Sequence, residues 1–331
     1  MIRRREFITL LGGAAATWSL AARAQQPAMP VVGFLVSGSA EGYADTVTAI
    51  RQSLSKMGYV EGHNVAIDYR FANEQYDRLP TLAADLVLQQ RVVVIFATGS
   101  VLPALAAKAA TTTIPIVFAN GSDPVALGLV ANLSRPGGNA TGVTFNSTEL
   151  GSKRLEMLHE LVPRATLIAF LVNPRNPNAE SSIADTQASA KILGVKLLVV
   201  NAVNASDLDV AFATIVQQRA DALVVGTDVL FNGPRRTQQL ITLAAVHAVP
   251  TMFSGRDRVA AGGLISYATD IDDMLRQAGV YIGRILKGEK PADLPVVQPT
   301  KFELAINLKT AKALGLQVSQ DMLSIADEVI E

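Results

Sequence analysis

The segment Ile114-Pro115-Ile116-Val117-Phe118 gives the plan of the chain, because it recurs farther along as Val249-Pro250-Thr251-Met252-Phe253. Each copy is followed by a loop that contains an Asp, and then by a Gly-Leu pair, Gly128-Leu129 in the first and Gly263-Leu264 in the second. The offset of about 130 residues is the size of one α/β domain. The repeat therefore predicts two similar lobes in place of one large domain.

A second pair of matching segments lies upstream of the repeat. An apolar strand ends in a polar turn at Ala97-Thr98-Gly99-Ser100, and again at Val225-Gly226-Thr227-Asp228. From Val31 onward, short apolar runs alternate with amphipathic stretches, which is typical of parallel sheets with crossover helices. These runs are too many for one ordinary doubly wound sheet, so we expect an α/β fold with two parallel sheets in two lobes that face each other. The predicted strands are 31–36, 65–71, 92–97, 116–119, 141–145, 167–172, 195–200, 222–225, 251–253 and 264–267, and the predicted helices include 43–57, 77–90, 152–161, 179–193 and 206–218.

The composition argues against several classes of protein. The 331 residues carry no formal net charge, so nothing favours binding to nucleic acid or to a membrane surface. The absence of Cys and the presence of only three His leave little material for a zinc site or a thiol nucleophile. No G-x-G-x-x-G fingerprint, Walker motif or nucleophile elbow occurs. We therefore expect no cofactor, no metal and no catalytic residue, although a triad assembled in space would leave no local signature.

The first residues have the pattern of an export signal. Arg3, Arg4 and Arg5 form a basic start, an apolar stretch runs from Leu10 to Ala22, and Ala22-Arg23-Ala24 matches an A-x-A cleavage site. The pair Arg4-Arg5 before Glu6-Phe7-Ile8 resembles a twin-arginine signal. The apolar stretch is short and rich in Gly and Ala, so an uncleaved membrane anchor is the less favoured alternative. We expect a mature periplasmic protein without residues 1–24, with a net charge of about −3.

Polar side chains follow the predicted strands, at the edge where parallel sheets bind ligands. Hydroxyls, amides and backbone N–H groups suit a carboxylate, and an Asp suits an ammonium, so the set fits a zwitterion such as an amino acid. Ser100, Asp123 and Asp228 could instead cap helices or turns, and Asn173 and Arg256 could be turn and surface residues. The candidate ligand-binding residues are Ser37, Glu41, Thr98, Gly99, Ser100, Ser122, Asp123, Asn146, Asn173, Asn176, Thr227, Asp228 and Arg256.

Several longer motifs resemble the ABC transporter substrate-binding family that includes tryptophan-type binding proteins. The resemblance spans nearly all of residues 31–320 and is carried by Thr98-Gly99-Ser100, Gly121-Ser122-Asp123-Pro124-Val125, Pro136-Gly137-Gly138-Asn139-Ala140-Thr141-Gly142, Asn173-Pro174 and Asn307-Leu308-Lys309-Thr310-Ala311-Lys312-Ala313-Leu314-Gly315. It implies a type I periplasmic-binding fold, in which two Rossmann-like lobes are joined by three crossing segments and close on a ligand. Many relatives carry a lipoprotein signal, which this chain lacks because it has no Cys.

The resemblance also implies boundaries and partners. Lobe 1 would comprise residues 31–145 and about 271–295, and lobe 2 residues 146–270 and about 296–331. Loops at Thr98–Ser100, Ser122–Asp123, Asn173 and Asp228 would face the cleft, with Asp123 as the ammonium partner. The protein would be a monomer that captures a small polar ligand, an amino acid or an aromatic acid, and passes it to an ABC permease in the inner membrane. A periplasmic sensor that feeds a membrane receptor, or an exported α/β enzyme, are the alternatives, and the ligand itself is not specified.

Overall fold

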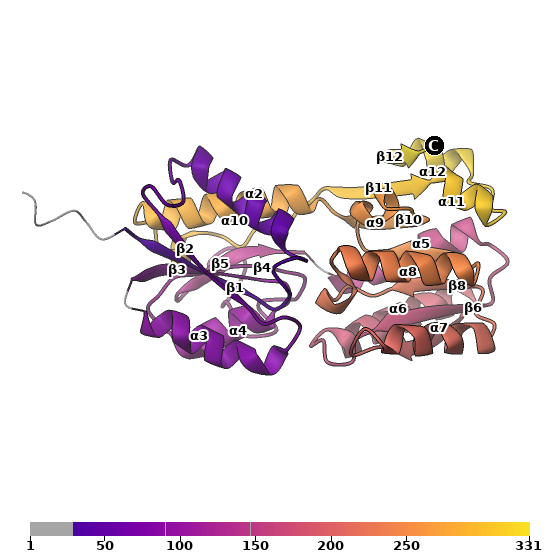
Figure 1. The fold of residues 1–331 in the computed structure, drawn as a ribbon, viewed down its shortest axis with the longest axis horizontal. Helices are drawn as coiled ribbons and strands as arrows, with labels where there is room; N and C mark the ends of the chain where they lie inside the picture. Colours follow the sequence, from indigo (N-terminus) through magenta and orange to yellow (C-terminus); the bar gives the residue numbers. More distant parts are fainter. Residues whose placement is uncertain (1–28, 90, 146) are drawn as a thin grey trace, which may run out of the picture.

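The computed structural model describes residues 29–331 except 90 and 146. The expected leader (residues 1–24) and the candidate Asn146 lie outside the described residues. The described chain forms two α/β lobes that lie side by side, and each has a sheet between layers of helices (Figure 1). The predicted fold class is therefore confirmed.

Lobe 1 contains a parallel five-stranded sheet in the order β2-β1-β3-β4-β5. One face packs under α2 and α10 around buried Phe34 and Phe96, and the other packs under α3 and α4 around Phe118. The elements are β1 (Val31–Val36), α2 (Ala44–Lys56), β2 (Ala66–Phe71), η1 (Tyr76–Arg78), α3 (Leu79–Leu88), β3 (Val92–Thr98), α4 (Leu102–Ala110), β4 (Ile116–Asn120), β5 (Ala140–Thr144), α10 (Ile271–Leu286) and η3 (Pro291–Asp293).

Lobe 2 contains a seven-stranded sheet in the order β12-β11-β10-β9-β8-β6-β7, in which only the β10–β11 pair is antiparallel. Phe170 and Leu158 belong to the core on one face, and Phe212 and Phe253 to the core on the other. The elements are α5 (Ser147–Leu161), β6 (Leu167–Val172), α6 (Ala179–Leu193), β7 (Lys196–Asn201), α7 (Asp207–Gln217), β8 (Ala222–Val225), η2 (Val229–Phe231), α8 (Pro234–Val246), β9 (Thr251–Phe253), α9 (Arg256–Ala260), β10 (Ile265–Thr269), β11 (Phe302–Asn307), α11 (Leu308–Ala313), α12 (Gln320–Ser324) and β12 (Glu328–Ile330).

The two sheets share one connectivity. The order β2-β1-β3-β4-β5 in lobe 1 corresponds strand by strand to β7-β6-β8-β9-β10 in lobe 2. The repeated Pro-containing segments are β4 and β9, which occupy equivalent positions in the two sheets. Strands β11 and β12 extend lobe 2 beyond this shared unit, and the pattern of short apolar runs did not predict them.

The chain passes between the lobes after β5, after β10 and again before β11 (Figure 1). Val297 still pairs with Val143 of lobe 1, so the last crossing lies between Val297 and Phe302, a few residues beyond the boundary expected near residue 295. Helix α10 returns to lobe 1 and packs closely on α2, where a Cβ on Gly279 would lie only 2.4 Å from Cβ of Ser53. Two of the crossings thus flank α10, which anchors them to lobe 1. No described helix has both the length and the apolar character needed to cross a membrane.

Candidate functional site

A buried carboxylate organises the carboxyl edge of the lobe 2 sheet. Asp228 follows β8, and its residue is only 5% exposed. Its Oδ1 accepts hydrogen bonds from Asn173 Nδ2 at 2.9 Å and from the Leu230 amide at 2.8 Å. Its Oδ2 accepts a bond from Asn176 Nδ2 at 2.7 Å. Burial raises the pKa of this carboxyl above its ordinary value, although the hydrogen bonds oppose the shift.

Hydrogen bonds join this edge to lobe 1. The Tyr76 hydroxyl, which follows β2, donates to Asp228 Oδ2 at 3.1 Å. The Ser122 hydroxyl, which follows β4, donates to Asn178 Oδ1 at 2.9 Å, and Asn178 precedes α6 of lobe 2. Both contacts connect loops at the carboxyl ends of strands in different lobes. The two sheets therefore face each other across the edge at which parallel sheets bind ligands.

A buried cation lies beside the same carboxylate loop. Arg154, on α5, is 2% exposed. Its Nε donates to the Tyr267 carbonyl at 2.7 Å, and its Nη1 donates to Thr227 Oγ1 at 2.8 Å. Burial, and then the nearby charge of Arg258, lower the pKa of the guanidinium to about 9. The side chain still carries a positive charge at neutral pH.

The facing edge of lobe 1 contains small polar residues. Ser37 directly follows β1 and is fully buried, and Gly99 lies against it with a φ of +98°. A Cβ on Gly99 would lie 2.5 Å from Ser37 Oγ, so only Gly suits this turn. Within the described part of the chain, Ser37 Oγ and Asn120 Nδ2 lack hydrogen-bond partners, as does Thr269 Oγ1 in lobe 2. Buried polar atoms without partners mark a place where a ligand or water is expected to bind.

The structure gathers some of the predicted site residues and separates others. Asn173, Asn176, Thr227 and Asp228 form one network in lobe 2. Ser37, Thr98, Gly99 and Ser122 form the facing edge of lobe 1; Thr98 Oγ1 donates to the Ala119 carbonyl there at 2.9 Å.

Three other candidates have different roles in the described contacts. Asp123 is exposed, and its Oδ1 caps a turn by accepting bonds from the Val125 and Ala126 amides. Ser100 Oγ accepts a bond from the Leu102 amide at the start of α4. Glu41 is exposed and lies 3.6 Å from Arg235 of lobe 2. For Asp123 and Ser100, these contacts favour the capping role that the sequence had left open.

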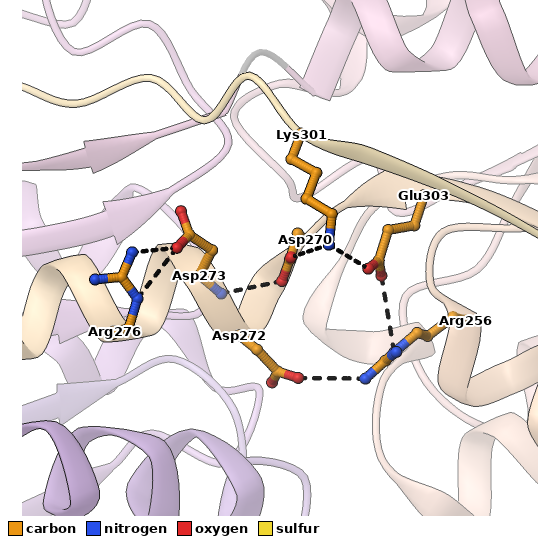
Figure 2. Close-up of a pocket in the computed structure, with 7 residues that line it drawn as sticks. All are labelled: Arg256, Asp270, Asp272, Asp273, Arg276, Lys301 and Glu303. Carbon is orange, nitrogen blue, oxygen red and sulfur yellow. Dashed lines mark hydrogen bonds and ion pairs between the residues drawn. The ribbon is translucent and has the colours of Figure 1, made fainter. Parts of the chain in front are cut away.

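Arg256 belongs to a different site, a charged pocket of about 370 Å³ beside two of the crossing segments (Figure 2). Its guanidinium contacts Asp272 at 3.3 Å and Glu303 at 3.8 Å. Lys301 contacts Asp270 at 2.8 Å and Glu303 at 3.2 Å. We call this set the hinge pocket, and it is lined by Arg256, Asp270, Asp272, Asp273, Arg276, Lys301 and Glu303. Its charges are paired with each other.

Sequence reasoning missed Tyr76, Arg154 and Asn178. Tyr76 and Asn178 are placed by contacts between lobes, for which no local pattern exists. Arg154 did leave a signal, because it is spaced four and seven residues before the buried Leu158 and Leu161 of α5. A charged residue on the apolar face of a helix marks a buried charge. In the described residues, no group of three or more His, Asp or Glu side chains is arranged to hold a metal ion.

The comparisons with known proteins agree with this geometry. Residues 31–330 match the family model described as ABC transporter substrate binding protein. A tyrosine-binding protein of Clostridioides difficile is 28% identical over 268 residues, which cover 80% of this chain and 75% of that protein. A Streptococcus pneumonia ABC domain in complex with L-Trp has a TM-score of 0.81 at 25% identity, over 91% of this chain and 99% of that one.

A further solved structure differs in the arrangement it reports. It is a ligand-free, open substrate-binding protein with adhesive properties from Clostridium difficile, with a TM-score of 0.64 at 25% identity over 91% of this chain and 99% of that chain. The chain belongs to the ABC transporter substrate-binding protein family. It is therefore the binding component of a transporter and not an enzyme, as the sequence predicted.

Proposed function

We propose that this substrate-binding protein captures a free amino acid between its two lobes and delivers it to an ABC permease. The observation that carries the proposal is the pair of hydrogen bonds from Tyr76 to Asp228 and from Ser122 to Asn178. Because these bonds join strand-end loops of different lobes, a ligand at this edge would contact both lobes. Such a ligand stabilises the closed arrangement over an open one, which is how a hinged binding protein couples capture to closure.

The class of ligand is supported by the relatives and by the charges of the edge. One relative is named for tyrosine and another structure holds L-Trp. The edge offers a buried carboxylate at Asp228, a buried guanidinium at Arg154, and unpartnered hydroxyl and amide atoms at Ser37 and Asn120 among the described residues. The guanidinium suits the carboxylate of an amino acid, and the unpartnered atoms suit its other hydrogen-bonding groups.

The arrangement of the lobes supports capture in the closed state. At 25% identity in each case, the structure has a TM-score of 0.81 with the L-Trp complex and 0.64 with the ligand-free, open protein. The lobes here are therefore placed more like those of the complex.

The test is a thermal-shift panel of amino acids and small aromatic acids with the purified protein. The cognate compound should raise the melting temperature by about 5 °C at a hundredfold excess over its Kd, because binding only to the folded state stabilises it by about 2.7 kcal/mol. Light scattering on the same samples should give a monomer. An unchanged melting temperature with every compound would contradict an amino acid or aromatic acid as the ligand class.

We also propose that the protein reaches the periplasm through a cleaved twin-arginine signal. The proposal is supported by Arg4-Arg5 before an apolar stretch and by Ala22-Arg23-Ala24. Replacing both Arg4 and Arg5 by Lys should keep the precursor inside the cell, whereas Arg3→Lys should not. Mass spectrometry of the exported protein should find an N-terminus at Gln25, and export of the double variant at the normal level would contradict the assignment.

A further inference from the structure

The position of Arg154 is unusual for a charged side chain. It lies on the apolar face of α5 with Leu158, and its residue is 2% exposed. Its two hydrogen-bond acceptors among the described residues, the Tyr267 carbonyl and the Thr227 hydroxyl, are both neutral. These bonds fix the plane and direction of the guanidinium, but they do not balance its charge. The side chain is thus oriented before any ligand arrives.

No counter-ion balances this charge within the described part of the chain. Arg154 takes part in none of the ion pairs formed by the described residues. The charge of another cation, Arg258, adds to the cost of burial in lowering the pKa of Arg154. Burying an ion without a partner is costly, and proteins avoid it unless another group supplies the opposite charge.

The buried carboxylate of the same edge does not supply this charge. Asp228 accepts hydrogen bonds from Asn173, Asn176, Leu230 and Tyr76. A carboxylate has about four lone-pair positions, so these donors already fill its capacity. The missing anion must therefore come from outside the described set of side chains.

The guanidinium also lies where a ligand would be. Thr227 lies two residues after the end of β8 and directly before Asp228, which contacts Tyr76 of the other lobe. Tyr267 belongs to β10, and Thr269 two residues later lies on the same face and has an unpartnered hydroxyl among the described residues. The Arg154 guanidinium from α5, held by the Tyr267 carbonyl of β10, and the Thr269 hydroxyl of the same strand together suit an oxyanion.

We propose that Arg154 binds the carboxylate of the ligand, with Thr269 as a second contact, so that the cleft selects carboxylates over the corresponding amines that lack this group. The inference rests on the proposed function, because it assigns a residue to the amino acid captured between the lobes. It replaces Asp123, which is exposed and caps a turn, as the main charged residue of recognition.

The experiment compares Arg154→Met and Arg154→Lys with the matched surface change Arg284→Met. Arg284 pairs with Glu289 near the end of α10, away from the cleft edge. Calorimetry should find that the wild type binds L-tyrosine or L-tryptophan at least about 30-fold more tightly than tyramine or tryptamine. Arg154→Met should lose this preference, Arg154→Lys should retain part of it, and Arg284→Met should keep it in full.

A second measurement separates a ligand contact from a structural role. Without ligand, Arg154→Met should melt at or above the wild-type temperature, because it removes an unpaired buried charge. A structural role predicts a clear fall in the melting temperature and an unchanged preference for acids over amines, and that result would overturn the inference.

A third measurement needs no cognate ligand. Sodium acetate, compared with sodium fluoride at equal ionic strength, should raise the melting temperature of the wild type and of Arg284→Met but not of Arg154→Met. Equal effects of acetate on all three proteins would overturn the inference. If no amino acid stabilises the wild type while acetate distinguishes the variants as expected, the amino acid proposal fails and the carboxylate contact stands.

Discussion

Two regions near the junction of the lobes differ in whether their charged side chains form ion pairs. In the hinge pocket, the charged side chains are paired with each other, and Asp272 and Arg256 are largely exposed (Figure 2). At the cleft edge, Asp228 and Arg154 are buried, and neither takes part in an ion pair among the described residues. Acidic and basic side chains are thus paired in the hinge pocket, but buried and, in the part of the chain that the structure describes, unpaired at the cleft edge.

This difference indicates which of the two regions binds a ligand. Exposed ion pairs contribute little to stability, because water and salt screen them. Buried charges held only by neutral groups cost free energy, and a protein keeps them where a partner supplies the opposite charge. The hinge pocket therefore needs no ligand to account for its charges, whereas the cleft edge does.

The largest expected effect contrasts one aspartate from each region. Asp228→Ala should lower the free energy of unfolding by about 3 kcal/mol, because it leaves Asn173 and Asn176 without their buried acceptor. Asp272→Ala, whose side chain is 78% exposed, should change it by less than about 0.5 kcal/mol. Urea unfolding measures both. Similar losses in the two variants would remove the contrast between the regions.

A smaller effect is expected at the contact between lobes. Tyr76→Phe removes the hydroxyl that donates to Asp228, and it should weaken binding of the cognate amino acid about fivefold, because one hydrogen bond that favours closure is lost. The control is Tyr69→Phe, since among the described residues the Tyr69 hydroxyl bonds to Arg51 and Glu61, both of lobe 1. Calorimetry should show normal affinity for the control. Equal weakening in both variants would show that the contact between lobes does not contribute to closure.

The smallest effect concerns how folding stability depends on pH, because Asp270 and Asp228 should contribute to this dependence with opposite signs. Burial alone would raise the pKa of Asp270, but bonds from Lys301 and the Asp273 amide lower it below its ordinary value. Asp270 therefore stabilises the fold above the unfolded carboxyl pKa, and this contribution is lost as the pH falls through the lower folded pKa. Burial raises the pKa of Asp228, so its ionisation opposes folding, and stability declines as the pH rises from the unfolded carboxyl pKa to the raised one.

Urea unfolding between pH 3 and pH 7 tests these signs with Asp270→Asn and Asp228→Asn. The free energy of unfolding of the wild type should exceed that of Asp270→Asn by less as the pH falls. Relative to Asp228→Asn, the wild type should lose stability as the pH rises. If the stability difference between wild type and variant changed with pH in the same direction for both substitutions, the raised pKa assigned to Asp228 would be contradicted.

The fold was largely predictable because its signals are local. Helix α6 was predicted with the bounds that it has, Ala179–Leu193, and the repeat located β4 and β9 at equivalent positions. Strand β11 was missed, and its position depends on antiparallel pairing with β10 from far along the chain. Short periodic runs do not report such pairings.

The site was predictable only in part, for the same reason. The rule that ligands bind at the carboxyl ends of strands selected Asn173, Thr227 and Asp228, which the structure brings together. It also selected Asp123, which equally follows a strand but lies exposed in a turn. Arg154 was missed because its burial depends on Thr227 and Tyr267, which are 73 and 113 residues away. Sequence position identified the edge and its carboxylate, whereas the contacts that bury Arg154 there emerged from tertiary packing.

A crystal structure of the protein grown with the amino acid that stabilises it most tests the central claim directly. We expect a ligand between the lobes that contacts residues of both sheets, with its carboxylate within hydrogen-bond distance of the Arg154 guanidinium. A ligand bound in the hinge pocket against Arg256 and Lys301, or one whose carboxylate is held without Arg154, would contradict that claim.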